Sequence, residues 1–161
     1  MPWHTIERKV EDALKTYFQT VLTYEIADAQ FVTRFSNEDL TEPRIEIYCP
    51  ACRPFNEEVG PYSGNWEVDC IIKVVSHYDQ SGTEAEAHDN IMGNLVDKIL
   101  VVDDNGNEAF ASQVNATLFD VDLQVIQLMR LGERTNSIEE HSLVTEQELS
   151  VLVMPSNQGD T

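Results

Sequence analysis

A long run of alternating residues, at positions 66–78, restricts what this chain can fold into more than any other feature. One face carries Trp66, Val68, Cys70, Ile72 and Val74, and the other carries Glu67, Asp69, Ile71, Lys73 and Val75. This alternation is typical of a strand with one buried face, because successive side chains point to opposite sides. At ~3.3 Å per residue the strand would be roughly 35 to 40 Å long. A strand of that length can extend past its own domain.

Four other segments are predicted to be strands. Residues 30–35 and 44–49 are rich in β-branched and aromatic side chains, with turn-forming residues between them. Residues 121–131 and 143–154 alternate in the same way as the long run. The segment 133–142 that joins these last two is polar, and it is predicted to be a loop.

Helices are predicted before and within this series of strands. Residues 5–22 have apolar side chains at three- and four-residue spacing, which indicates an amphipathic helix. Thr83 and Glu86 form a capping-box pattern that predicts a second helix, ended by residues 103–106. Residues 108–118 are predicted to be a shorter helix. The predicted apolar face of the second helix consists of Ala87, Ile91, Leu95, Ile99 and Val102.

These elements predict an α+β fold. Cleanly alternating strands are typical of an antiparallel sheet with helices on one face. We therefore expect a mainly antiparallel sheet of about four to five strands, with the N-terminal helix and one or two further helices packed on one face. With 161 residues, the chain suits one core better than two. Residues 1–154 are expected to form this single domain, and residues 155–161 a flexible tail.

The charge of the chain limits its partners. Ten basic residues face twenty-nine acidic ones, which gives a net charge of −19. This balance argues against a nucleic-acid binder, because affinity for phosphates depends largely on Lys and Arg. It fits high solubility or a surface that repels polyanions. We expect no membrane span and no signal peptide, and a reducing cytosolic environment in which the three cysteines need not pair.

One short motif could carry metal or redox chemistry. Cys49-Pro50-Ala51-Cys52 is a CxxC sequence, and only Cys70 and His77 could complete a four-ligand zinc site with it. Redox CxxC motifs normally open a helix, whereas this one closes a predicted strand. The alternative is that the cysteines are small, buried and reduced packing residues.

No other pattern indicates catalysis. His4, His77, His88 and His141 are far apart in the sequence and match no metal or nucleophile motif. The glycines lack the spacing of a phosphate-binding loop. A hydrolase would require His77 or His88 to lie with a carboxylate and a nucleophile in one cleft. We therefore predict no enzyme activity, no catalytic or metal residue and no cofactor.

The order of elements and several short phrases resemble the tail-terminator (tail-completion) proteins of long-tailed phages. The resemblance covers nearly the whole chain and includes no catalytic signature. The amphipathic first helix and the proline-rich segment after residue 49 are part of it. The phrases are Pro43-Arg44-Ile45-Glu46-Ile47, Ser63-Gly64-Asn65-Trp66-Glu67-Val68, His77-Tyr78-Asp79, Ala87-His88-Asp89 and Met154-Pro155-Ser156.

This resemblance implies a homo-hexameric ring in the neck of a virion, made in the host cytoplasm. Such a ring caps the tail tube, ends its polymerisation and presents a docking face to the head-completion or connector protein. The sheets would encircle a channel through which DNA passes without specific binding. Six chains of −19 would carry about −114, and acidic walls would let DNA slide.

Two alternatives to a terminator stay open. A neck adaptor in the adjacent ring would share much of this organisation. A protein of another class, a small zinc- or ligand-binding domain, would use Cys49, Cys52, Cys70 and His77.

Residues 50–65 are predicted to form a long loop, since the segment contains three prolines and two glycines. Phe55, Tyr62 and Trp66 are our candidates for contact with a neighbouring subunit or the tube, because aromatic side chains often anchor interfaces. The alternative is that these rings fold back onto their own sheet.

Overall fold

The long alternating run forms the middle strand of a five-stranded sheet. The computed structural model describes residues 5–23, 25–26, 28–33, 39–55, 64–118 and 123–154. Within them the strand order is β1-β2-β3-β5-β4, antiparallel except for the parallel pair β1 and β2. The strands are β1 (Gln30–Thr33), β2 (Arg44–Pro54), β3 (Trp66–His77), β4 (Gln124–Glu139) and β5 (Ser142–Met154). The predicted α+β fold with a mainly antiparallel sheet is confirmed.

The predicted alternation of the middle strand is confirmed. Val68, Cys70, Ile72 and Val74 are buried on the face that β3 turns to the core. β3 pairs with β5 along its whole length, from Trp66 opposite Val153 to His77 opposite Ser142. This unbroken register gives the sheet two distinct ends, one at Trp66 and the other at His77.

The first helix is α1 (Ile6–Val21), and it covers one face of the sheet. The Thr5 hydroxyl caps it by accepting a hydrogen bond from the Arg8 N–H, at 3.2 Å. Its fully buried face consists of Val10, Leu14, Tyr17 and Phe18. These side chains pack against β1 and β2, as the predicted amphipathic pattern requires.

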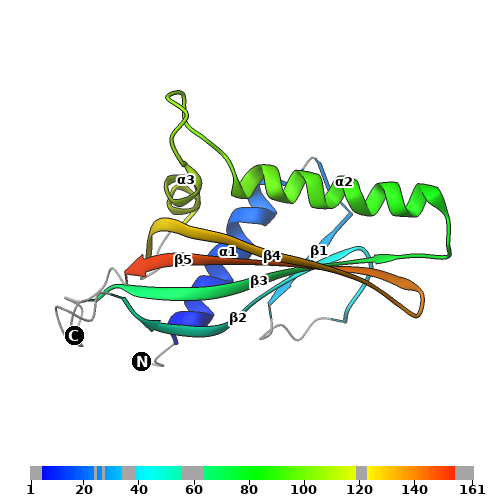
Figure 1. The fold of residues 1–161 in the computed structure, drawn as a ribbon, viewed down its shortest axis with the longest axis horizontal. Coiled ribbons are helices and arrows are strands. Elements are labelled where there is room, and N and C mark those ends of the chain that lie inside the picture. The colour runs from blue at the N-terminus through cyan, green and yellow to red at the C-terminus, as the bar shows by residue number, and fades with distance from the viewer. Residues whose placement is uncertain are drawn as a thin grey trace.

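Two further helices, α2 (Gly82–Ile99) and α3 (Phe110–Ala116), lie on the same side of the sheet, since both contact α1 (Figure 1). The Tyr17 ring packs edge-on against Phe18 and Phe110, with centroids 5.1 and 5.5 Å away. Its hydroxyl donates to the Lys98 carbonyl in the last turn of α2, at 2.7 Å. One residue thus links all three helices. None of the helices in the described part of the chain is long and apolar enough to cross a membrane.

The start and the face of α2 differ from the prediction. The helix begins two residues earlier, because the Ser81 hydroxyl, and not that of Thr83, caps it by accepting the Thr83 N–H. The buried face therefore contains His88 and Met92 beside the predicted Ile91, Leu95 and Ile99, whereas Ala87 is exposed. Val102 lies beyond the end of α2 and is also exposed.

The predicted loop at 50–65 was wrong for its first five residues. β2 continues through the CxxC motif to Pro54. A bulge between Tyr48 and Ala51 makes this possible, since it interrupts the ladder where Pro50 cannot donate a hydrogen bond. The buried Glu11 carboxylate of α1 accepts the Cys49 N–H there, at 2.9 Å. Residues 56–63 and the predicted tail at 155–161 lie outside the described residues.

The predicted loop at 133–142 was also wrong, because this polar segment is a hairpin. β4 runs on to Glu139, and β5 begins at Ser142 after a tight turn in which Glu140 has a φ of 51°. Residues 133–141 are all exposed, so strand pairing here needs no apolar residues, and alternation gave no signal. β4 has 16 residues where β5 has 13, and three bulges between Val125 and Arg134 take up the difference.

Replacing Tyr17 tests how far the helices depend on one side chain. Tyr17→Phe removes the hydroxyl that donates a hydrogen bond to the Lys98 carbonyl, and should lower the free energy of unfolding by about 1 kcal/mol. Tyr17→Ala also empties the space between α1 and α3 and should cost roughly 3 to 5 kcal/mol. The measurement is urea unfolding followed by circular dichroism.

Tyr48→Phe, on the sheet face away from the helices, is the control and should stay within about 0.5 kcal/mol of the wild type. Equal effects of Tyr17→Phe and Tyr48→Phe would contradict the proposed role of the Lys98 hydrogen bond.

Candidate functional site at one end of the sheet

The predicted zinc ligands do not come together. Cys49 and Cys70 are neighbours in the core, with their sulfur atoms 3.4 Å apart, and both are buried free thiols. Cys52 donates instead to a Glu7 carboxylate oxygen, at 3.1 Å. His77 lies seven residues along β3 from Cys70, about 23 Å at roughly 3.3 Å per residue, and faces the opposite side of the sheet. The structure therefore brings together two of the four candidate ligands.

Cys52 is also unsuited to redox or nucleophilic chemistry. Burial raises the pKa of this thiol to about 12, with a further contribution from the hydrogen bond to Glu7. The reactive form of cysteine is the thiolate, and a thiol with this pKa stays protonated at neutral pH. The cysteines of β2 and β3 thus behave as packing residues, which was the alternative to a metal or redox site.

Of the three aromatic candidates for an interface, Phe55 and Trp66 lie at the Trp66 end of the sheet. Trp66 is half-buried and packs against the edge of the core, opposite Pro54 and Val153. The Phe55 N–H donates to the Asn65 carbonyl at 2.9 Å, which closes the base of the segment between β2 and β3. Tyr62 lies outside the described residues. Trp66 thus belongs partly to its own sheet, and the remaining exposed part of its surface is left for other contacts.

The other end of the sheet carries a cluster of ionisable side chains from four segments. His77 ends β3, Asp79 follows it, Glu84 lies in the first turn of α2, and His141 lies in the β4–β5 turn. His77 Nε2 is 2.9 Å from Asp79 Oδ2 and 3.9 Å from Glu84 Oε2. His141 Nδ1 is 3.6 Å from the other Asp79 oxygen. We call His77, Asp79, Glu84 and His141 the terminal cluster.

Backbone hydrogen bonds fix the segments that carry these side chains. The Tyr78 N–H donates to the His141 carbonyl at 2.7 Å and so joins the end of β3 to the hairpin turn. The Asp79 N–H donates to Glu84 Oε1 at 2.7 Å, so the same carboxylate faces both the turn and His77. The positions of the two histidines relative to Asp79 are therefore set by the main chain.

The charge around His77 is strongly negative. The hydrogen bond to Asp79, followed by the charge of Asp79 and then those of Glu84 and Glu42, raises the pKa of His77 above its usual value. Glu42 lies 3.8 Å from His77 Nδ1 and accepts a hydrogen bond from Ser142. Arg44 lies 3.7 Å from the Glu42 oxygen that accepts the Ser142 hydrogen bond, which is not the oxygen near His77. The same guanidinium also pairs with Glu46 at 2.7 Å.

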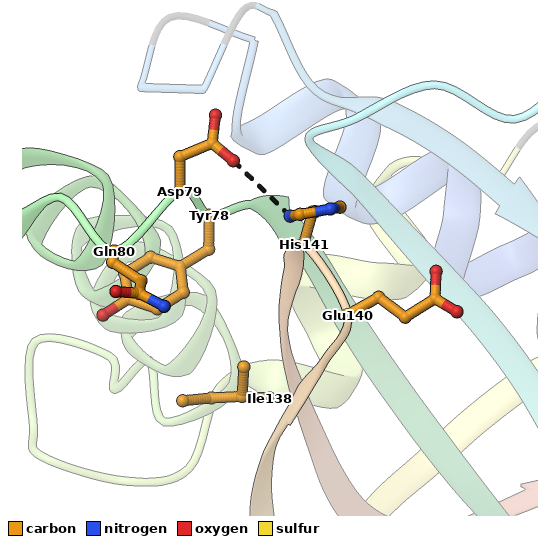
Figure 2. Close-up of a pocket in the computed structure, with 6 residues that line it drawn as sticks. All are labelled: Tyr78, Asp79, Gln80, Ile138, Glu140 and His141. Atoms are coloured by element: carbon orange, nitrogen blue, oxygen red, sulfur yellow. Dashed lines mark ion pairs between the residues drawn. The ribbon is translucent and has the colours of Figure 1, made fainter.

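A cavity of about 570 Å³ opens beside the terminal cluster. Figure 2 shows Asp79 and His141 at one side of it and the Tyr78 ring near Ile138 at the other, while Glu140 points away. Ile138 is 65% exposed, although it is a large apolar residue. The cavity thus combines carboxylate and imidazole groups with an uncovered apolar side chain.

A third histidine, His88, lies in a buried hydrogen-bond network and lines a separate cavity. Its Nδ1 is 2.7 Å from Ser76 Oγ, and its Nε2 is 2.8 Å from Thr145 Oγ1. The Thr145 hydroxyl donates to Asn136 Oδ1 at 2.8 Å, so toward His88 it acts as the acceptor of the Nε2–H. In a neutral imidazole the other nitrogen, Nδ1, is then the acceptor, and the Ser76 hydroxyl donates to it. Burial lowers the pKa of His88, which favours this neutral form.

Neither histidine completes the set that a hydrolase needs. His77 has carboxylates but no hydroxyl or thiol among the partners in the described part of the chain. His88 has two hydroxyl partners, and no carboxylate among the described residues accepts a hydrogen bond from its ring. The terminal cluster could not be predicted from the sequence, because His141 of the hairpin turn is more than sixty residues from His77 in the chain. A tight turn predicted at residues 140–141 would have placed it beside His77.

The two histidines should affect stability with opposite dependence on pH. An unfolded histidine has a pKa near 6.5, so below it the unfolded state takes up a proton that buried His88 resists. The stability that His88 contributes should therefore decline as pH falls from about 7 to 5, and the His88→Gln variant should lack this decline. The measurement is denaturant unfolding at each pH. His77 has a raised pKa, so its contribution should be present at low pH and lost as pH rises, and His77→Gln is the matched control. An identical pH slope in wild type and His88→Gln would contradict the neutral buried form.

The sequence was also compared with known proteins. No protein-family model and no curated protein matches it. The residues themselves therefore supply the basis for inferring what the chain does.

Proposed function

We propose that this chain is a structural subunit of a phage tail, which caps the tail tube as a ring, ends its polymerisation and joins the tail to the head. One observation carries the proposal most directly: the outer half of the β4–β5 hairpin is fully formed yet covered by nothing in the described chain. Residues 133–141 are exposed, and they nonetheless keep strand pairing up to the turn. An ordered strand edge of this kind is suited to contact with another copy.

The pairing along β4 divides this edge into two parts. All three bulges lie between Val125 and Arg134, and bulges twist an edge away from regular pairing. From Arg134 to Glu139 the register with β5 is regular, and Ile138 stands exposed there. Only this outer part therefore offers a straight edge together with an apolar anchor, which confines the proposed contact to one end of the strand.

A ring also requires a second, different surface on each copy, because a ring closes through head-to-tail contacts. The hairpin turn lies beside His77, whereas Phe55 and Trp66 lie at the opposite end of the sheet. Those residues, together with Tyr62, are the proposed contact with the neighbouring copy or with the tail tube protein. Two unlike surfaces at opposite ends of the sheet favour a closed ring over a symmetric pair.

The central strands carry more acidic than basic side chains on the sheet face away from the helices, which fits a channel wall. Its central strands carry three basic residues and five acidic ones: Arg44, Arg53, Lys73, Glu46, Glu67, Asp69, Glu146 and Glu148. Arg53 makes a two-pronged contact with Asp69, at 2.8 and 3.1 Å, in which the two charges offset each other. Burial, followed by the charges of Glu146, Glu148 and Glu46, raises the pKa of Tyr48 on this face. Such a wall would not retain DNA.

An adaptor in the adjacent ring of the neck is the alternative within the same class, and it would contact the connector protein on both sides. Ring number and position in the particle distinguish the two. The alternative of a zinc domain built from Cys49, Cys52, Cys70 and His77 loses its support, since those side chains do not converge.

Complementation of phage particles tests the proposed function. Particles made without this chain should have tails of irregular length that fail to join heads, and wild-type protein supplied in trans should restore uniform, joined tails. The Ile138→Asp variant should fold and fail to restore them, because it puts a charge on the proposed contact. Negative-stain images of tail length and joining give the readout.

Val102→Asp is the matched control, since Val102 is 57% exposed but lies in the turn after α2. It should restore tails as the wild type does. Normal, joined tails in particles that lack the chain would refute the tail function. Full restoration by Ile138→Asp would leave the tail function intact and refute the hairpin contact.

A further inference from the structure

The terminal cluster has the side chains and the spacing of a metal site. One nitrogen of His77 and one oxygen each of Asp79 and Glu84 all lie within 4.8 Å of one another. His77 Nε2 lies 2.9 Å from an Asp79 oxygen and 3.9 Å from a Glu84 oxygen. One distance is shorter and the other longer than the distance between two neighbouring ligand atoms of tetrahedral zinc. That spacing is about 3.4 Å for bonds of roughly 2.1 Å. A single ion could thus reach all three atoms after small side-chain movements.

We propose that the terminal cluster binds one Zn²⁺ ion through His77, Asp79 and Glu84, with His141 as the fourth ligand. Imidazole nitrogen and carboxylate oxygen together are a ligand set that zinc accepts readily, whereas Mg²⁺ prefers oxygen alone. His141 lies outside the group of three, with its Nδ1 3.6 Å from the Asp79 oxygen that does not face His77, so its exposed side chain would turn to complete the site. The cavity beside Asp79 and His141 gives an ion and its water a path to these two residues (Figure 2).

The balance of charge favours a dication over a simple ion pair. Even a protonated His77 would face three carboxylates, those of Asp79, Glu84 and Glu42. In the described residues the only arginine or lysine paired with any of these three is Arg44, which also pairs with Glu46. A divalent ion would offset the remaining negative charge, and two imidazoles would direct it to this point and not to the many other acidic residues of the chain.

A bound ion would also change what the hairpin can do. His77, Asp79 and Glu84 belong to β3, the following turn and α2, whereas His141 belongs to the hairpin turn. Zinc would therefore add a further tie between the hairpin turn and the body of the protein, beside the hydrogen bonds from Tyr78 to His141 and from Ser142 to Glu42. This site stands whether or not the chain is a tail protein, because it depends only on the ligands.

Calorimetric titration of the untagged, chelator-treated full chain with ZnCl₂ tests the proposal. We expect one ion per chain, no heat with MgCl₂, and a rise in the melting temperature with zinc, because the native state alone brings the ligands together. His77→Ala should abolish binding, and Asp79→Asn, Glu84→Gln and His141→Ala should each weaken it at least tenfold. In NMR spectra, zinc should shift the ring signals of His77 and His141.

Cys52→Ser is the matched control, since thiols also bind zinc. It should bind as the wild type does, and so should His88→Gln, whose imidazole lies in a different network. The absence of stoichiometric zinc from the wild type would overturn the proposal. Wild-type affinity in both His77→Ala and Asp79→Asn would overturn it too, as would loss of binding in Cys52→Ser alone.

Discussion

The buried ring of Tyr17 is the contact on which the rest of the structure depends. A sheet with one buried face needs a helical layer, and three helices form a layer only if they are fixed to one another. Tyr17 does this from a single position: its ring fills the space between α1 and α3, and its hydroxyl holds the end of α2. Burial raises the pKa of Tyr17 to about 12, so the hydroxyl remains a donor at any physiological pH.

α2 is held by polar contacts at two points with different consequences. Near its C-terminal end, the Lys98 carbonyl receives the Tyr17 hydroxyl, which satisfies one of the carbonyls that a helix end leaves without a partner. Nearer its N-terminal end, His88 reaches β3 through Ser76 and β5 through Thr145. The first contact secures the helical layer, and the second sets the distance between α2 and the hairpin. The geometry of the terminal cluster is set separately, by the hydrogen bonds of the Tyr78 and Asp79 N–H groups.

The sequence predicted elements well where burial alternates and poorly where it does not. The middle strand and α1 were predictable because one face of each meets the core and the other meets solvent. The outer half of the hairpin was not, since both of its faces are exposed and polar residues there look like a loop. The continuation of β2 through Pro50 depended on a bulge and on Glu11 from a distant helix. The terminal cluster depended on that same hairpin turn, so one missed element concealed the histidine that completes it. In the alternative of a zinc domain, His77 was grouped with three cysteines, whereas in the structure its neighbours are Asp79 and Glu84.

The unequal lengths of β4 and β5 determine where the sheet tolerates insertions and deletions. β4 pairs on one side only and already contains three extra residues, so removing one of them erases a bulge and leaves the remaining pairs in place. β5 pairs with β3 on one side and β4 on the other, and it has no spare residue. Losing a single residue from β5 would exchange its inward and outward side chains in two ladders at once. Evolution can therefore vary the length of the exposed strand freely, while the length of its inner neighbour is fixed.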